Sequence, residues 1–275
     1  MSHRSLKSVP CRPAAALVVA ALCLVPGVVP CVAEDVTPKM GAHPDLSGVW
    51  NGAVPARVYA VGDKIGLILA AREGTLDNFE RDNALMRRSD PNKPVYRPEF
   101  WEKVQKLDQE GNKEDPSYGC MPQGVPRMGP PLKIVQTARE LIFLYAGFQD
   151  TYRVIPIDGR KHTNLQDLDG TWKGEALGHW DDDTMVVDTI GFNDTSWLDI
   201  SGYFHSENMR VIERLKREGN TLRWQATVED PDVLLKPWVM NPRTLRLNAD
   251  PNAAPEETLP CSERDLSHLV TKEHH

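Results

Sequence analysis

Cysteine is scarce in this sequence, because the 275 residues hold five cysteines and three of them lie before residue 34. The remaining two, Cys120 and Cys261, are far apart, and neither has histidine or a second cysteine at the spacing of a metal site. There is no Cys-x-x-Cys pair. Two isolated thiols in an oxidising compartment most simply pair with each other, so we predict a Cys120–Cys261 disulfide.

The sequence also lacks the short motifs of several large enzyme classes. It has no Gly-x-Ser-x-Gly elbow and no Gly-rich phosphate-binding loop. Positive charge is not in excess either, since the formal net charge is -7. Nucleic acid is therefore not an expected partner, because binding to phosphate backbones depends on clustered Lys and Arg. Beyond residue 33 no apolar run approaches the length of a membrane span, which excludes a transmembrane segment in the mature chain.

Residues 1–33 have the composition of a cleaved secretory signal. Three cations precede an apolar run over residues 14–29, and Ala33 stands before an acidic segment. Cleavage would remove those cations and no acid, so the mature chain is more acidic than the full one. A lipid anchor at Cys31 is the alternative, which the preceding Pro30 disfavours. We predict an exported protein of the periplasm or the extracellular space.

The mature part, residues 34–275, is long enough for one sizeable core, and we predict a single domain with a Pro-rich C-terminal tail. An insertion of loops and helix occupies about residues 55–131. Within it a helix is predicted from Pro98 to Glu110, because large apolar residues recur at helical spacing: Phe100, Trp101, Val104 and Leu107. The Gly/Pro-rich segment 118–131 cannot form a central strand, so we expect it to wrap across one end of the domain.

From residue 132 onward the pattern predicts strand after strand without intervening helices. The predicted strands cover residues 132–136, 141–146, 152–157, 175–180, 184–190, 209–216, 222–228 and 238–247, after an opening strand near Trp50. Successive hairpins favour an antiparallel meander, and a closed meander avoids exposed edges. We therefore predict a mainly β fold: an antiparallel lipocalin-like β-barrel with a short helix and long N-terminal excursions. A β-sandwich is the alternative.

Strand alternation places several charged side chains on otherwise apolar faces: Arg153, Asp188, Glu213 and Arg243. Glu213, for example, alternates with Val211 and Leu215. A buried charge is costly unless it is paired or faces a wet cavity. The interior is thus predicted to hold either a salt-bridge network, with Glu213 paired to Arg153 or Arg243, or a polar ligand pocket.

A long loop over residues 192–206 mixes aromatic residues with groups that can transfer protons. Long loops in compact domains are often lids or binding loops. Four residues of this loop suit an organic ligand: Phe192, Asn193, Trp197 and Tyr203. Three could transfer protons: Asp194, Asp199 and His205. The alternative is a packed loop whose Asp and Asn residues cap local turns.

Two histidines, His179 and His205, are predicted to lie near the same hairpin. Close to a carboxylate they could form a general base with its orienting partner. They could also ligate a metal, but the local spacing of a metal site is missing, and we predict neither a metal nor a cofactor. Each could equally be a structural histidine.

Three segments of the sequence resemble a group of secreted bacterial proteins of unassigned function. They are Gly124 to Pro131, Gly178 to Trp180 together with Asp183 to Asp188, and Gly191 to Ser206. The similarity spans about residues 45–265. It implies a location in the bacterial envelope, and it implies no activity, cofactor or catalytic residue.

These observations predict an exported enzyme that acts on a small, partly apolar organic molecule by acid/base chemistry, as a lyase, isomerase or hydrolase. His205 or His179 would move a proton, with Asp194, Asp199 or Glu213 as partner. Arg153 or Arg243 would hold a negative charge on the substrate. The alternatives are a lipocalin-like binding protein for an apolar ligand and an envelope protein that docks partners through the aromatic loop.

Overall fold

The computed structural model describes residues 37–52, 57–61, 64–68, 92–110, 114–146, 151–199, 201–257 and 261. The segment predicted as a signal, residues 1–33 with Cys31, lies outside the described residues. In residues 57–61 and 64–68 the backbone alone is described.

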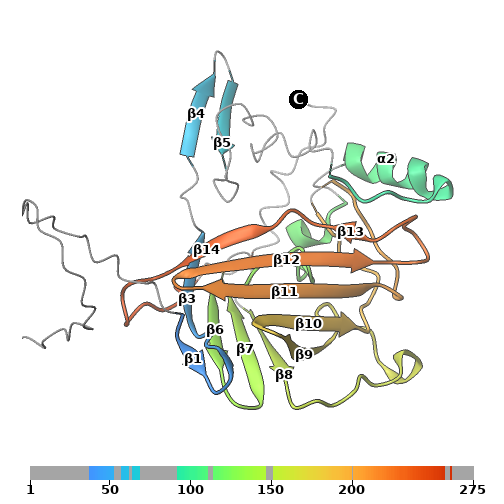
Figure 1. Cartoon of the computed structure of the whole chain (residues 1–275). Coiled ribbons are helices and arrows are strands. Elements are labelled where there is room, and N and C mark those ends of the chain that lie inside the picture. The colour runs from blue at the N-terminus through green and yellow to red at the C-terminus, as the bar shows by residue number, and fades with distance from the viewer. Residues whose placement is uncertain are drawn as a thin grey trace, which may run out of the picture. The chain divides into compact units, whose positions relative to one another are not determined.

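One antiparallel sheet dominates the described protein (Figure 1). Its nine main strands are β3 (Gly48–Gly52), β6 (Lys133–Gln136), β7 (Glu140–Tyr145), β8 (Thr151–Pro156), β9 (Glu175–Asp181), β10 (Thr184–Ile190), β11 (Arg210–Glu218), β12 (Thr221–Glu229) and β14 (Arg243–Leu247). The hydrogen-bonded order is β8-β7-β6-β3-β14-β12-β11-β10-β9. Main strands that are consecutive in sequence are paired, except β8 and β9 at the two ends of this order, and the first main strand, β3, pairs with the last, β14.

The sheet curls until β8 and β9 lie side by side. No ladder joins these two strands in the described part of the chain, yet a Cβ added at Gly178 of β9 would lie 2.7 Å from Ile157 Cγ2 and 3.3 Å from Ile155 Cγ2. The result is a nearly closed antiparallel barrel of nine strands, which confirms the lipocalin-like prediction and rejects the sandwich. Meander and closure together leave few exposed edges.

Two small hairpins form two-stranded sheets of their own. β1 (Lys39–Met40) pairs with β2 (His43–Pro44), and β4 (Arg57–Val61) pairs with β5 (Lys64–Ile68), both antiparallel. The second hairpin falls in the predicted insertion of residues 55–131.

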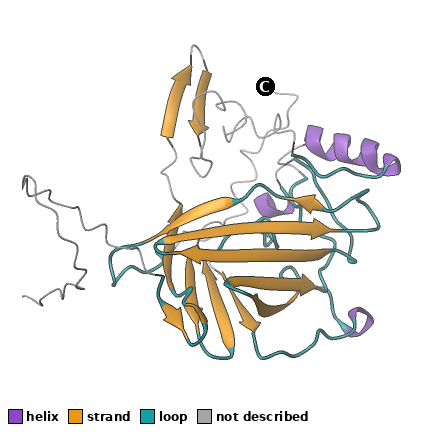
Figure 2. Ribbon diagram, in the orientation of Figure 1, coloured by secondary structure: helices purple, strands orange, loops and turns teal. Residues whose placement is uncertain are grey.

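The predicted helix is present as a short 3₁₀ turn, η3 (Pro98–Phe100), followed by α2 (Trp101–Glu110) (Figure 2). Phe100, Val104 and Leu107 are partly buried and pack against the core, at i, i+4 and i+7. Trp101, the fourth apolar residue of the predicted pattern, is 57% exposed and lies beside this stripe, where its indole N–H donates to the Tyr96 carbonyl.

The last predicted strand, residues 238–247, is divided in the structure. β13 (Trp238–Val239) pairs with β12, and β14 begins only at Arg243. Pro242 lies between the two strands and has no N–H to donate to a ladder, which accounts for the break.

Alternation along β11 and β12 defines the core. Leu222, Trp224, Ala226 and Val228 are fully buried, as predicted, and Glu213 lies among them at 1% exposure. Asp188 was predicted to share an inward face with Val186, but the inward residues of β10 are its neighbours Val187 and Thr189. The sequence could not determine which alternate residues of β10 face inward, because consecutive apolar residues occupy both faces of this strand.

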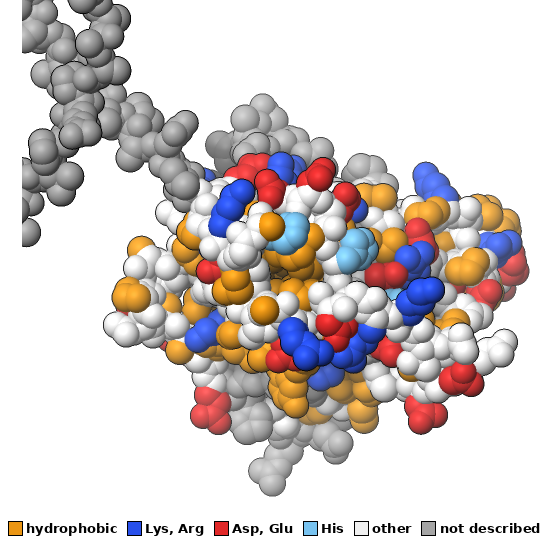
Figure 3. Space-filling view, turned by 60° about the horizontal axis from the view of Figure 1, so that its bottom comes forward, with side chains coloured by type: hydrophobic (Ala, Val, Ile, Leu, Met, Phe, Trp, Pro, Cys, Tyr) orange, Lys and Arg blue, Asp and Glu red, His pale blue; other side chains and the backbone are white. Residues whose placement is uncertain are grey.

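Asp188 instead faces outward and forms an ion pair with Arg210, with Oδ2 2.7 Å from Nη2. Acidic and basic side chains are mixed on the face shown in Figure 3, and hydrophobic side chains show between them. Neither sign of charge forms a separate patch on that face.

The Gly/Pro-rich segment wraps across one end of the barrel, as predicted. A 3₁₀ turn, η5 (Pro116–Gly119), leads into it, and Arg127 forms a buried bidentate ion pair with Asp115 at 2.7 and 2.8 Å. Cys120 and Cys261 form the predicted disulfide, with Cα atoms 5.6 Å apart. The ion pair thus closes the segment onto the turn that precedes it, and the disulfide joins it to Cys261.

Candidate functional site

The charged residues inside the barrel form one connected network. Arg153 Nη1 donates to Glu213 Oε2 at 2.6 Å and to the Tyr145 hydroxyl at 3.2 Å, while Nη2 donates to Thr189 Oγ1 at 3.0 Å. The second carboxylate oxygen of Glu213 accepts from the Trp224 indole at 3.0 Å. Both oxygens of Glu213 are therefore engaged, and of the two predicted interiors the salt-bridge network is the one present around Glu213.

Burial fixes the charge states in this network. Desolvation by itself would lower the pKa of Arg153, but the negative charge of Glu213 outweighs it and the net pKa of Arg153 is raised. Burial raises the pKa of Tyr145, with Arg153 opposing and Glu213 adding to the shift. Arg153 is thus a cation and Tyr145 a neutral phenol at all ordinary pH values.

Arg243 shares the inward face of Trp224, as predicted, because these two residues are paired in the β12–β14 ladder. Its guanidinium lies over the indole ring of Trp224, with Cζ 5.6 Å from the ring centroid. Glu213 was predicted to pair with Arg153 or with Arg243, and it pairs with Arg153.

His205 is buried and makes two hydrogen bonds. Its Nδ1 lies 3.0 Å from the Ser206 carbonyl oxygen, and its Nε2 lies 2.8 Å from Ser196 Oγ. A carbonyl only accepts, so Nδ1 carries the proton and Nε2 accepts the hydroxyl proton of Ser196. Burial lowers the pKa of His205, against the opposing charges of Asp230 and Asp194. The imidazole is therefore held neutral, with its basic nitrogen on a serine hydroxyl.

Asp230 positions His205 through Ser206. Its carboxylate accepts from the Ser206 N–H at 2.7 Å and from the Ser206 hydroxyl at 2.8 Å, and it is 3% exposed. Ser206 in turn supplies the carbonyl that sets the tautomer of His205. The sequence prediction missed both Ser196 and Asp230, because neither lies in a motif and their roles depend on contacts across the loop.

The aromatic loop does not form the expected open pocket mouth. Phe192, Trp197 and Phe204 are at most 6% exposed, and Tyr203 packs against the same core. Asn193 Oδ1 accepts from the Thr195 N–H at 3.2 Å, which is the turn-capping role of the alternative interpretation. Burying three large aromatic rings stabilises the loop more than exposing them to solvent would.

Of the remaining predicted catalytic residues, Asp194 acts on His205 through its charge, whereas His179 and Glu213 lie elsewhere in the fold. His179 is exposed on the outer face of β9, beside Val186 of β10. Asp194 is exposed and Asp199 is half-buried. Glu213 belongs to the ion pair inside the barrel. The structure therefore brings together a serine and a histidine, and it does not bring together the two histidines with a carboxylate.

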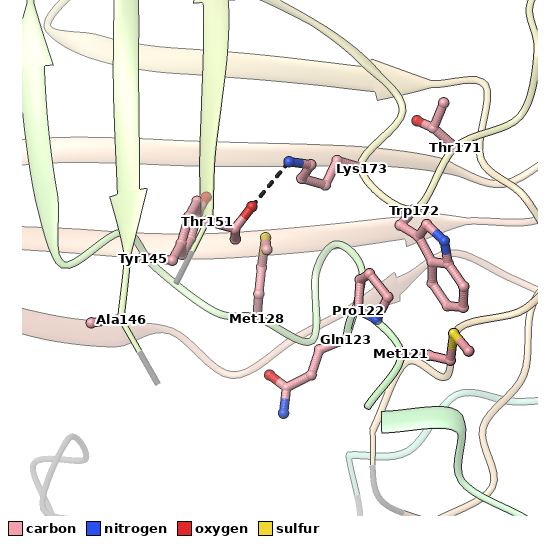
Figure 4. A pocket seen from close by; sticks show the side chains of 10 residues that line it. All are labelled: Met121, Pro122, Gln123, Met128, Tyr145, Ala146, Thr151, Thr171, Trp172 and Lys173. Carbon is pink, nitrogen blue, oxygen red and sulfur yellow. Dashed lines mark hydrogen bonds between the residues drawn. The ribbon is translucent and has the colours of Figure 1, made fainter. Parts of the chain in front are cut away.

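A pocket of about 210 Å³ opens where the Gly/Pro-rich segment crosses the barrel end (Figure 4). It is lined by Met121, Pro122, Gln123, Met128, Tyr145, Ala146, Thr151, Thr171, Trp172 and Lys173. These residues come from the segment itself, from the facing ends of β7 and β8, and from the approach to β9. None of the predicted ligand-binding residues lines this pocket.

Lys173 is the charged residue of the pocket lining. Its Nζ donates to Thr151 Oγ1 and to the Tyr152 carbonyl, each at 3.0 Å. Burial lowers the pKa of Lys173, and the nearby charge of Arg153 lowers it further. The one sequence signal for this pocket was the Gly/Pro-rich segment, which predicted a closed barrel end but not which residues would face it.

Gly124 lies between the pocket and the Ser196–His205 pair. Gly124 follows the lining residue Gln123 and has a φ of +73°. A Cβ at Gly124 would lie 2.5 Å from Ser196 Oγ and 3.2 Å from the Trp172 carbonyl oxygen. Only glycine allows so close an approach at this backbone angle, so the serine hydroxyl lies directly behind the wall.

In the residues that the structure describes, no group of three or more His, Cys, Asp or Glu side chains is arranged to hold a metal ion. No helix in the described part of the chain is long and apolar enough to cross a membrane.

Fold and site together define a nearly closed antiparallel barrel with an ion-paired interior and a pocket at one end. No family model matches the chain, and neither the curated proteins nor the solved structures contain a significant match.

Proposed function

We propose that this protein is an exported binding protein that holds a small, partly apolar organic molecule in the pocket at the end of its barrel. The observation that carries the proposal is the pocket itself, where Met121, Met128 and Trp172 provide apolar contact beside a few polar groups. Concave sites of this composition are the usual form of small-molecule sites. Methionine side chains adapt to irregular ligands, and an indole offers a large stacking face.

The size of the pocket limits the ligand. Sites for drug-sized molecules occupy roughly 300–1,000 Å³, and this pocket of about 210 Å³ is smaller. Near Glu213 the barrel interior is occupied by Trp224 and Arg153, which hydrogen-bond to it. We therefore propose a ligand with no more than about three rings, or a short chain.

The test uses N-phenyl-1-naphthylamine, a neutral apolar dye that fluoresces when it leaves water. The mature protein should bind the dye, and Trp172→Ala should weaken binding roughly tenfold, since an aromatic side chain contributes both buried area and stacking. Trp101→Ala is the matched control, because Trp101 is an exposed tryptophan on α2. Equal effects of the two substitutions, or no dye uptake by the wild type, would refute the proposal.

A second candidate function follows from the Ser196–His205 pair. With Nε2 of His205 accepting the Ser196 proton, the hydroxyl could attack an ester carbonyl carbon while the imidazole takes the proton. The imidazolium would return this proton to the departing alkoxide, and water would then hydrolyse the acyl-serine and release the acid. The step requires the Gly124 wall to move aside, because it covers Ser196. This candidate keeps His205 as the proton acceptor of a hydrolase.

The hydrolase candidate is tested with p-nitrophenyl acetate. Wild-type hydrolysis above the background rate, lost in Ser196→Ala and retained in His179→Gln, would support it. Hydrolysis that survives Ser196→Ala would exclude Ser196 as the nucleophile.

A further inference from the structure

We infer that the pocket selects an organic anion, whose charged group is held by Lys173 and whose apolar body contacts Met128 and Trp172. The inference rests on the proposed binding function and adds the chemical class of the ligand. The charge around the pocket is positive, whereas the chain as a whole is acidic.

The pocket lining is positively charged in an acidic protein. Of the ten lining residues, Lys173 carries a formal charge and none is Asp or Glu. The full chain has a formal net charge of -7. A cation in a concave site with low-dielectric walls attracts anions more strongly than one on an open surface.

A second cation lies behind the pocket wall. Arg153 donates to the hydroxyl of Tyr145, which is a lining residue, and its charge acts on Lys173. Glu213 neutralises one positive charge, so the group of Lys173, Arg153 and Glu213 retains one. The Arg153 Nε–H is a buried donor that has no acceptor among the described residues. This end of the barrel therefore has donors and positive charge in excess.

The ammonium group of Lys173 has donor capacity for a ligand. An ammonium carries three N–H donors, and within the described chain two acceptors are recorded for Lys173, Thr151 Oγ1 and the Tyr152 carbonyl. Figure 4 shows its side chain running across the pocket toward Thr151. Both acceptors are uncharged, and the centroid of the Tyr152 ring lies 5.5 Å from Nζ, so dipoles and this ring offset burial of the cation, which is consistent with its lowered pKa. A bound anion would supply the missing countercharge.

The experiment compares two dyes that share one aromatic frame. 8-Anilinonaphthalene-1-sulfonate carries a sulfonate, and N-phenyl-1-naphthylamine is the uncharged counterpart. Both are titrated by fluorescence into the mature wild-type protein, Lys173→Met and Lys173→Gln. The second variant removes the charge but keeps an N–H donor, on a side chain one atom shorter. Lys161→Met is the control, since Lys161 is an exposed lysine away from the pocket lining.

The wild type should bind the sulfonate dye more tightly than the neutral dye. Both Lys173 variants should weaken sulfonate binding roughly tenfold, or about 1.4 kcal/mol, because each removes a charge-assisted hydrogen bond to the sulfonate. They should change neutral-dye binding much less than sulfonate binding, and Lys161→Met should change neither.

Two results would overturn the inference, and they differ from failure of the proposed function. If both dyes bind and Lys173→Gln affects them equally or not at all, the pocket binds ligands but does not select anions. If neither dye binds the wild type, the binding function itself is wrong. Urea unfolding of each variant identifies any general loss of structure.

Discussion

Arg153 Nη1 and Glu213 Oε2 lie 2.6 Å apart inside the barrel, where both side chains are at most 3% exposed. The pair joins β8 to β11 across the interior, and Trp224, Thr189 and Tyr145 complete its hydrogen bonds. Two charges so deeply buried depend on each other, because either one alone would lack compensation.

Removing one partner of this pair should destabilise the fold strongly. Arg153→Met leaves Glu213 buried and uncompensated, and we expect the free energy of unfolding to fall by about 3–5 kcal/mol. The double variant Arg153→Met/Glu213→Leu should recover most of that loss, since buried pairs are often replaceable by apolar residues. Urea unfolding at neutral pH measures both. A double variant no more stable than the single one would show that the pair itself supplies net stability.

The close approach at Gly124 gives a second prediction. Gly124→Ala should cost more than Gly159→Ala, although both glycines have positive φ, +73° and +80°. Both variants bear the cost of a left-handed alanine, about 1–2 kcal/mol. Only at position 124 would the new Cβ meet another atom, Ser196 Oγ at 2.5 Å, whereas nothing lies within 4 Å at Gly159. The clash at position 124 should lower the free energy of unfolding by about a further 1–3 kcal/mol. Urea unfolding of the two variants measures this difference. Equal losses would contradict the contact.

The buried histidine predicts a dependence of stability on pH. Burial lowers the pKa of His205 from its ordinary value of 6.5. Between the lowered value and 6.5 the unfolded chain therefore binds a proton that the folded chain does not. The free energy of unfolding should thus rise with pH through this window and level off above it.

Comparing two variants assigns that slope to His205. The contribution should disappear in His205→Gln and persist in His179→Gln, whose residue is exposed on β9. The measurement is urea unfolding at a series of pH values from about 5 to 8, which brackets the ordinary histidine pKa. An unchanged slope in His205→Gln would show that other groups cause it.

The disulfide links stability to ligand binding. Cys261→Ser opens a covalent link between residues 141 positions apart, and the expected loss of stability is about 2–5 kcal/mol. Since Met121, Pro122 and Gln123 follow Cys120 directly and line the pocket, dye binding should weaken as well. Reducing the wild type with dithiothreitol should reproduce both effects. Insensitivity of the wild type to the reductant would argue against the bond.

Several elements could be predicted from sequence because their signals are local. The strand periodicity and hairpin turns after residue 132 predicted an antiparallel barrel, and the spacing of Phe100, Val104 and Leu107 predicted the helix. Alternation along β11 placed Glu213 inside, since Val211 and Leu215 share its buried face and the other face carries the exposed Arg210, Arg214 and Lys216. On β10 the same reasoning failed for Asp188, because apolar residues occupy both faces.

The candidate site depended on contacts between distant segments, which no local pattern encodes. Whether an aromatic residue such as Trp197 lines a pocket or fills the core is decided by what packs on it, and the tertiary structure buries it. Lys173 faces a pocket only because the segment after Cys120 crosses the barrel end beside it. The sequence by itself determined the barrel and the charge in its interior, through periodicity and composition. Which residues meet at the open end was decided only by tertiary packing.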